Sequence, residues 1–171
     1  ILAFQIINES KFLAPKQAVT MSRILASAAG SRGMAGGQDM DIRAINKKLS
    51  IKKLEQMYVL KTGVLLGAAV KLGALAANIN DPREFKFLDK FAKNVGLAFQ
   101  IQDDIFNIES NADKLGKNVG TDKKCNKTTY PALVGIPAAT AKIGRLWQSA
   151  EKSLQKLQTN TRLLQELVAY I

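Results

Sequence analysis

The sequence predicts an all-α protein whose helices pack antiparallel to one another. Apolar residues recur at the helical spacing of three and four positions along several segments, whereas no segment alternates apolar and polar residues convincingly, as a strand would. Glycine and proline residues mark the ends or beginnings of these segments. With 171 residues, of which 47% are apolar and 23% charged, the chain can form one globular domain with a substantial core.

The first predicted helix covers residues 20–29 and ends at Gly30, because glycine often follows the last turn of a helix. Gly33, Gly36 and Gly37 come next. Since no Gly-Lys-Ser/Thr follows them, they do not form a phosphate-binding loop. Glycines about one helical turn apart more often allow two helices to approach closely, and we expect that role here.

The most apolar part of the chain is predicted to form one long helix over residues 51–78. Its glycines lower the helix propensity and therefore suggest a closely packed neighbour. These glycines are Gly63, Gly67 and Gly73. The apolar run over 57–79 is interrupted by Lys61 and Lys71, so we expect a helix buried in a protein core and no stable membrane insertion.

A further helix is predicted to begin at the sequence Asp-Pro-Arg-Glu, residues 81–84. Asp81 suits the N-cap, Pro82 suits the first turn, and Glu84 occupies the capping-box position. The helix should run from residue 82 to about 108, a length of roughly 40 Å at 1.5 Å per residue.

The last part of the chain is predicted to close the bundle. Pro131 and Pro137 interrupt the chain, and two amphipathic helices follow over residues 138–157 and 161–171. At the other end, ILAFQIINES starts inside an apolar pattern without Met, a capping residue or a basic stretch. We therefore expect a truncated N-terminus and no signal peptide.

The composition excludes several kinds of chemistry. The chain has no histidine, so histidine-containing triads, imidazole zinc sites and histidine general bases are unavailable within it. Its one cysteine rules out an internal disulfide and, with no secretory signature, suggests a reducing, cytoplasmic setting. The net charge of +11 favours anionic partners, which include nucleic acid, acidic lipid and phosphorylated metabolites.

Four polar residues are predicted to share one stripe of the helix that begins at residue 82: Gln100, Asp103, Asp104 and Asn107. Two adjacent aspartates repel each other unless a cation lies near them. Mg²⁺ commonly binds one or two protein carboxylates and completes its shell with water and phosphate oxygens. The alternative is a solvated acidic face near the end of the helix, where negative charge is mildly unfavourable. The spacing leaves both interpretations open.

Three lysines are candidates for binding an anion. Lys61, followed by Thr62, interrupts an apolar helix where core packing would favour leucine, although a long lysine side chain can also reach the surface. Lys117 and Lys127 come after the aspartates and are surface residues by default. Convergence of all three lysines on one anion would be meaningful, but a sequence alone does not show convergence.

Five blocks of sequence stand in a fixed order along the chain. They are LAF at the start, GMAGGQDMDI at 33–42, KTGVLLGAAVKLGA at 61–74, GLAFQIQDDIFNI at 96–108 and LGKNVGTDKKCNKTTYPALVG at 115–135. Together they resemble the C-terminal half of a trans-isoprenyl diphosphate synthase of the polyprenyl synthetase family, similar to bacterial farnesyl or geranyl diphosphate synthases. The resemblance implies the antiparallel helix bundle of isoprenoid synthases, with residues 1–171 as the C-terminal part of a single domain.

The resemblance also implies a role for each matching residue. Asp103 and Asp104 stand in the family's second aspartate-rich motif, which holds a Mg²⁺ ion that bridges the allylic diphosphate. That motif ends in a third aspartate where this chain has Asn107, so we expect weaker magnesium binding with the site retained. Gln38 and Asp41 match a block that packs close by.

The substrate-binding residues follow from the same resemblance. Lys61 contacts the diphosphate, and Thr62 lines the path of the carbocation. Gln100 lies near the same pocket, and Lys117 and Lys127 complete a cationic clamp. The implied reaction is a Mg²⁺-dependent, head-to-tail condensation of an allylic diphosphate with isopentenyl diphosphate. It needs no histidine, and the complete enzyme is implied to be a cytoplasmic homodimer.

Two alternatives stand beside a prenyltransferase. The family's first aspartate-rich motif does not occur in this sequence. The chain alone is therefore expected to lack activity, and a non-catalytic or degenerate partner subunit is the first alternative. The second and more remote alternative is a basic helical protein that binds nucleic acid. Against it stand the scattered basic residues, an aromatic content of 6% and the lack of a helix-turn-helix or RNA-binding signature.

Overall fold

The computed structural model describes residues 1–113 and 127–170, and the regular structure of these residues is entirely helical. The elements, in chain order, are α1 (Leu2–Glu9), α2 (Pro15–Ala29), α3 (Met34–Arg43), α4 (Ile51–Tyr58), the π-helical turn η1 (Val59–Gly63), α5 (Val64–Ala76), α6 (Pro82–Asp113), α8 (Tyr130–Val134), α9 (Ile136–Leu154) and α10 (Arg162–Tyr170). The predicted all-α class is confirmed.

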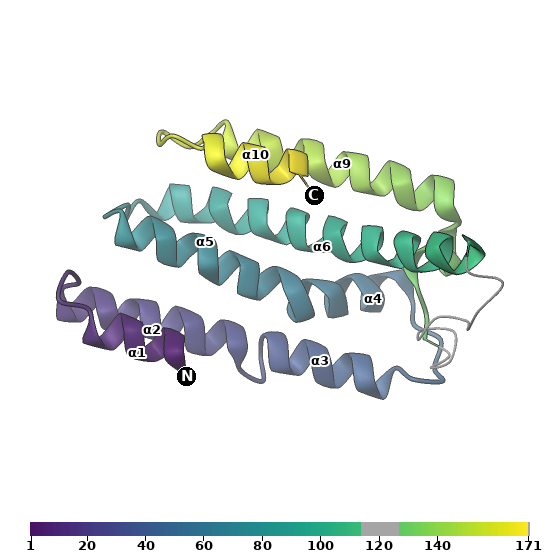
Figure 1. The fold of residues 1–171 in the computed structure, drawn as a ribbon, viewed down its shortest axis with the longest axis horizontal. Coiled ribbons are helices and arrows are strands. Elements are labelled where there is room, and N and C mark those ends of the chain that lie inside the picture. Colours follow the sequence, from purple (N-terminus) through teal and green to yellow (C-terminus); the bar gives the residue numbers. More distant parts are fainter. Residues whose placement is uncertain (114–126, 171) are drawn as a thin grey trace.

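The helices lie side by side and run antiparallel, as predicted (Figure 1). The helices α2 and α3 follow one another along one edge, and α4, η1 and α5 form the next row. Next to that row lies α6, then α9 with α10 beside it. The long helix α6 is therefore central, packed against α5 and η1 on one side and against α9 on the other.

The beginning of α6 has the predicted N-cap. Asp81 Oδ1 accepts a 2.8 Å hydrogen bond from the backbone N–H of Arg83. Glu84, at the capping-box position, is buried and accepts a 3.0 Å hydrogen bond from the N–H of Gln158. It thereby fastens the start of α6 to the segment after α9, which the capping-box prediction did not include. The helix continues to Asp113, past the predicted end at residue 108.

Near the N-terminus, α2 is longer than the sequence predicted, and α3 was not predicted. The helix expected over residues 20–29 begins at Pro15, because proline suits the first turn. It ends as expected at Gly30, whose N–H donates a 2.9 Å hydrogen bond to Ala26 O. The glycine-containing segment after it folds into α3, for which the sequence analysis gave no helix.

The closing helices are confirmed with shifted bounds. The segments predicted over 138–157 and 161–171 correspond to α9 and α10. Pro131 and Pro137 lie in the first turns of α8 and α9, where a missing backbone N–H leaves no hydrogen bond unmade. Both prolines thus begin helices, and the break in the chain lies just before each of them.

The long helix predicted over residues 51–78 is continuous to Ala76 but not uniform, because η1 widens it locally between α4 and α5. Among the residues that the structure describes, Ile51–Ala76 is long and apolar enough to cross a membrane, and 28% of its most apolar window is buried. The segment is covered where it meets α2, α3 and α6. The expectation of a helix buried in a protein core is therefore met only where the segment contacts these helices, and its remaining face is exposed.

Apolar clusters hold the layer together. The first joins α4, α6 and α9 around Leu54 and Ile101, and the second joins α6, α9 and α10 around Phe91 and Leu154. A third joins α1, α2 and α5 around Met21. The side chains of Leu54, Ile101, Phe91 and Leu154 are almost completely buried, so the central helix α6 is anchored on both sides.

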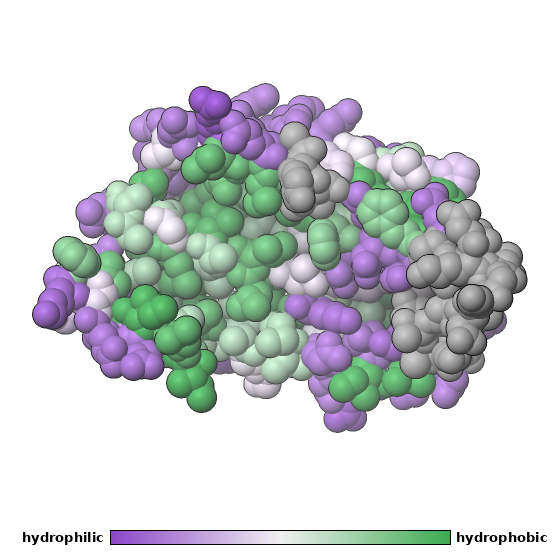
Figure 2. Space-filling view, viewed as in Figure 1, coloured by the Kyte–Doolittle hydropathy of each residue, from purple (hydrophilic) through white to green (hydrophobic). Residues whose placement is uncertain are grey.

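A broad apolar area remains on the face seen in Figure 2. Several helices carry large apolar side chains that are exposed, among them Ile6 on α1, Val19 on α2, Leu65 on α5 and Phe99 on α6. Soluble monomers rarely expose a large continuous apolar surface. A surface of this kind is typical of a face that another polypeptide segment or chain covers.

Candidate functional site

Lys61 and Lys127 meet at one carboxylate. Lys61, in η1, places its Nζ 2.9 Å from Oδ2 of Asp41 on α3, and Lys127 places its Nζ 3.0 Å from the same oxygen. The Asp41 side chain is only 7% exposed, whereas the lysine side chains are 34% and 24% exposed. Each ammonium group has three N–H donors, so both can contact Asp41 and still donate to a bound anion.

Charge interactions outweigh burial at Asp41. Burial by itself raises the pKa of the carboxyl group, but hydrogen bonds and charge interactions with Lys61 and Lys127 lower it further than burial raises it. The pKa of Asp41 therefore lies below its ordinary value of 3.8, and the group is ionised at neutral pH. One carboxylate between two lysines orients both of them and leaves one net positive charge for an anionic ligand.

Glycines allow η1 to lie directly against its neighbours. A Cβ on Gly37 of α3 would overlap the backbone of Lys61, and a Cβ on Gly96 of α6 would lie 2.5 Å from the Cα of Gly63. The prediction that glycines in both segments permit close helix contact is confirmed at these positions. The turn that carries Lys61 is thus held between α3 and α6 by backbone contacts that no larger residue would allow.

The two adjacent aspartates of α6 have different surroundings. Asp104 is buried, and its Oδ2 accepts hydrogen bonds from the Tyr58 hydroxyl at 2.6 Å and from the backbone N–H of Tyr130 at 2.7 Å. Asp103 is exposed to solvent, and the Asn107 amide nitrogen lies 3.5 Å from its Oδ2. Asp103 is therefore accessible to a ligand, while Asp104 accepts hydrogen bonds from α4 and the start of α8.

A short segment connects the lysine pair to the aspartate pair. Lys127 contacts Asp41, and three residues later Tyr130 contacts Asp104. Three residues span at most about 10 Å, so the two polar groups belong to one region of the molecule. Thr128, between them, donates to Lys47 O at 3.0 Å and accepts from a backbone N–H before α4, which fixes the segment in place.

The other predicted site residues lie along the same interface. Thr62 follows Lys61 in η1 and is half-buried, and Gln100 of α6 is half-buried as well. Tyr58, the last residue of α4, meets Asp104 at one end of this stretch, and Gly63 of η1 meets Gly96 at the other. Thr62 and Gln100 therefore lie between two contacts that join the α4–η1 segment to α6. Lys117 lies outside the described residues.

Sequence reasoning missed several polar partners. Tyr130 donates a 3.0 Å hydrogen bond to Glu55, which also pairs with Lys142 at 2.7 Å. Burial, followed by the hydrogen bond and charge of Glu55, raises the pKa of Tyr130 to about 12. No local pattern indicates these contacts, because each joins residues that are distant in sequence. The only signal for Asp41 in the sequence was the match of Gln38 and Asp41, within GMAGGQDMDI at 33–42, to a family block expected to pack close to the site.

The oxygen-bearing side chains near Asp103 favour a metal ion that binds together with a phosphate-containing substrate. Within the described parts of the chain, no three or more Asp, Glu, Cys or His side chains are grouped so that they could hold an ion. Asp103 offers one exposed carboxylate, and Asn107 offers a neutral amide next to it. Mg²⁺ retains several waters and is commonly bound by one or two carboxylates together with substrate phosphates. The residues fit that mode of binding and do not form a complete protein cage.

An antiparallel helix bundle with an aspartate pair on its central helix, beside lysines from neighbouring elements, has the architecture of the isoprenoid synthase class. The chain belongs to the polyprenyl synthetase family, whose sequence profile matches residues 1–169. The resemblance carried by the five sequence blocks is therefore confirmed.

Two similar proteins of known description are farnesyl diphosphate synthases. The one from Escherichia coli (strain K12) is 40% identical over 175 residues, which cover 99% of this chain and 58% of that protein. The one from Haemophilus influenzae is 39% identical over 169 residues, which cover 97% of this chain and 57% of that protein. The chain thus spans a little over half the length of these relatives.

Solved structures of related enzymes have the same fold as this chain. A geranyltransferase from Helicobacter pylori, in complex with magnesium and isoprenyl diphosphate, superimposes with a TM-score of 0.80 and 28% identity. The match covers 99% of this chain and 55% of that one. An FPP/GFPP synthase from Zymomonas mobilis gives a TM-score of 0.81 at 28% identity, over 99% of this chain and 56% of that one.

Proposed function

We propose that this protein is a prenyltransferase that condenses an allylic diphosphate with isopentenyl diphosphate, in the manner of a farnesyl or geranyl diphosphate synthase. The observation that carries the proposal is the meeting of Lys61 and Lys127 at Asp41, one short segment away from the aspartate pair. Family membership and relatives that are farnesyl diphosphate synthases support it.

The lysines bind the diphosphate of the allylic substrate. Lys61 and Lys127 are held on the same oxygen of Asp41, so their remaining donors are fixed in position before substrate binds. Negative charge grows on the diphosphate as the allylic C–O bond breaks, and ammonium groups that are already oriented stabilise that charge without reorganisation. Lys117 is proposed to join this clamp. Thr62 and Gln100 are proposed to line the adjacent path of the carbocation.

Asp103 and Asp104 have different proposed roles, one in metal binding and one in positioning. Asp103, exposed beside Asn107, is proposed to hold Mg²⁺ together with substrate phosphate oxygens. When bound, the ion would neutralise charge on the departing diphosphate. Asp104 fixes the end of α6 through Tyr58 and Tyr130 and so positions Asp103 for the ion. The neutral amide of Asn107 in place of a third carboxylate predicts weaker magnesium binding.

Two observations indicate how this chain fits into the proposed enzyme: the share of its relatives' length that it spans, and its exposed apolar surface. The chain spans 57–58% of two farnesyl diphosphate synthase relatives and carries a broad apolar area that its own helices leave uncovered (Figure 2). We propose that residues 1–171 are the C-terminal part of one domain whose remaining helices cover this area. A homodimer in the cytoplasm is the proposed state of the complete enzyme.

A non-catalytic partner subunit is the second candidate. The observation that favours it is Asn107, because the loss of a third carboxylate weakens a metal site that already has a single exposed aspartate. The two candidates differ in turnover. A partner subunit keeps the fold and the lysine pair but transfers no prenyl group on its own.

Incorporation of radiolabelled isopentenyl diphosphate into an acid-labile or extractable prenyl product tests the proposal in the full-length gene product. We expect Mg²⁺-dependent incorporation that falls at least a hundredfold in Asp103→Asn, because the exposed carboxylate is lost. Asp39→Asn, which removes an exposed carboxylate from α3 that pairs with Arg43, is the matched control and should retain activity. No incorporation by the parent protein would favour the partner subunit, and an unchanged rate in Asp103→Asn would refute the metal assignment.

A further inference from the structure

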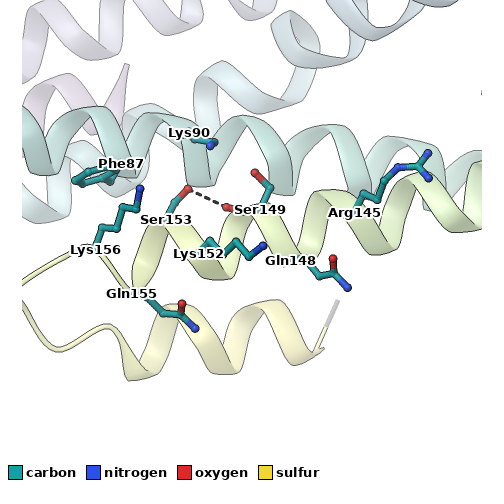
Figure 3. Close-up of a pocket in the computed structure, with 9 residues that line it drawn as sticks. All are labelled: Phe87, Lys90, Arg145, Gln148, Ser149, Lys152, Ser153, Gln155 and Lys156. Carbon is teal, nitrogen blue, oxygen red and sulfur yellow. Dashed lines mark hydrogen bonds between the residues drawn. The ribbon is translucent and has the colours of Figure 1, made fainter.

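A groove of about 600 Å³ lies between α6 and α9 (Figure 3), and neither Asp41 nor its two lysines are among the residues that line it. Four basic side chains line it: Lys90 from α6, Arg145 and Lys152 from α9, and Lys156 directly after α9. These residues are distant in sequence and become neighbours because α9 packs along α6. The scattered basic residues of the sequence are therefore gathered here by the fold.

The positive charge of this groove is not compensated. None of the residues that line it is acidic, and none of the four basic residues forms an ion pair with a described carboxylate. The lysines of the candidate site differ in this respect, because Asp41 balances part of their charge. Four cations without counter-ions repel one another, so an anionic ligand that binds between them relieves the repulsion.

Neutral donors complete the lining. Ser149 accepts a 3.0 Å hydrogen bond from Asn94, so its own hydroxyl proton remains to be donated. The side-chain amides of Gln148 and Gln155 extend along the same side of the groove (Figure 3). Hydroxyl and amide groups beside ammonium and guanidinium groups are typical donors to phosphate oxygens.

The spacing along α9 indicates the size of the ligand. On α9, Arg145, Ser149 and Lys152 share one face over roughly 10 Å, and Lys156 lies beyond the last turn. A single phosphate group cannot contact the cations at both ends of such a stripe. We propose that this groove binds a ligand with at least two phosphate groups, either a soluble oligophosphate compound or the headgroup of a diphosphorylated lipid.

The lining disfavours a nucleic acid strand. Such strands are commonly held by aromatic rings on which bases stack. Phe87 is the aromatic residue of this groove, and Lys156 Nζ lies 5.4 Å from the centre of its ring, which covers that face. Phosphate recognition therefore dominates over base recognition, and none of the residues that line this groove belongs to the proposed prenyl-transfer site.

Calorimetric titration with inorganic triphosphate, without divalent cations, tests the proposal. Three double variants of the chain are compared with the parent: Lys90→Ser with Lys152→Ser in the groove, Lys61→Ser with Lys127→Ser at Asp41, and Lys16→Ser with Lys52→Ser as a control. The control changes the charge by the same amount at exposed lysines outside the groove. We expect the groove variant to raise the dissociation constant of one binding event at least tenfold and the Lys16 and Lys52 control to change it less than twofold. A separate binding event that only the Lys61 and Lys127 variant removes would belong to the proposed prenyl-transfer site. Circular dichroism verifies that each variant is folded.

Vesicle flotation distinguishes the two sources of phosphate. Groove-dependent binding to vesicles that contain cardiolipin, whose headgroup has two phosphates, would support a lipid ligand; triphosphate binding without flotation would support a soluble one. Equal weakening in the control variant, or weakening confined to the Lys61 and Lys127 variant, would overturn the proposal. Tighter groove-dependent binding of a single-stranded oligonucleotide than of triphosphate would also overturn it. Prenyl transfer itself is tested separately, by the incorporation of isopentenyl diphosphate.

Discussion

The Tyr58 hydroxyl donates a 2.6 Å hydrogen bond to Asp104, across the interface between α4 and α6. The same carboxylate oxygen accepts from the backbone N–H of Tyr130. Asp103, one position earlier, is exposed. Two adjacent aspartates thus serve different purposes, since one accepts hydrogen bonds within the fold and the other faces solvent.

This division predicts that two similar substitutions change the stability by different amounts. Asp104→Asn should lower the free energy of unfolding by about 1–3 kcal/mol, because an amide oxygen accepts the two hydrogen bonds more weakly than a carboxylate oxygen and the new NH₂ group is placed in a buried position. Asp103→Asn should change it by less than about 0.5 kcal/mol, since the residue is exposed. Urea unfolding followed by circular dichroism measures both. Equal stability of the two variants would contradict the assigned positioning role of Asp104.

Asp41 should be the more sensitive of two aspartates on α3. Asp41→Asn leaves Lys61 and Lys127 close together without their shared counter-charge, and we expect a loss of about 1–3 kcal/mol in unfolding free energy. Asp39→Asn removes an exposed ion pair with Arg43 and should cost less than about 1 kcal/mol. Chemical denaturation of both variants at neutral pH gives the comparison. A larger loss of unfolding free energy in Asp39→Asn than in Asp41→Asn would contradict the stabilising role assigned to the two lysine contacts of Asp41.

The contribution of Asp41 should depend on pH in a defined direction. Its pKa in the folded protein lies below 3.8, so its stabilising effect is present above pH 3.8 and is lost as the pH falls through the folded-state pKa. The difference in unfolding free energy between the parent and Asp41→Asn should therefore be complete at pH 7 and shrink below about pH 3.8. Unfolding curves measured from pH 7 down to pH 3 test this. A difference that grows on acidification would have the wrong sign.

The contact between α3 and η1 predicts a strong effect of one added methyl group. Gly37→Ala places a Cβ into the backbone of Lys61, so we expect a loss of more than about 2 kcal/mol in stability and a displaced lysine. Gly73→Ala is the matched control, because a Cβ there meets no atom within 4 Å and alanine favours a helix by up to about 1 kcal/mol. Thermal unfolding of both variants measures the difference in stability. A Gly37→Ala protein as stable as the Gly73→Ala protein would refute the close contact.

Tyr130 should ionise unusually late. Its pKa is about 12 in the folded protein against an ordinary 10.0, because of burial and then the nearby Glu55. Its stabilising effect is therefore complete below pH 10 and is lost as the pH rises through 12. The absorbance of tyrosinate at about 295 nm, taken as the difference between the parent and Tyr130→Phe, should show this late midpoint while circular dichroism reports a folded protein. Glu55→Gln should shift the midpoint downwards, and a midpoint near 10 in the folded parent would contradict the assignment.

Local sequence determined the helices α2, α4 to α6, α9 and α10, but it did not predict α1, α3 or α8. Asp81 caps α6 as predicted, and the spacing of Gln100, Asp103, Asp104 and Asn107 placed them along one helix. These features depend on residues within one or two turns of each other, so the sequence contains them directly. The π turn at Lys61 was not predicted, because it depends on the neighbours against which Gly63 packs.

Only the tertiary structure decided which charges meet. Asp41 and Lys127 are far apart in the chain, as are Asp104 and Tyr58, and each contact requires two or three packed helices. The basic residues between α6 and α9 likewise appeared scattered until these helices were placed side by side. Helical periodicity acts over a few residues, whereas ion pairs and buried hydrogen bonds depend on distances that only the packed core sets.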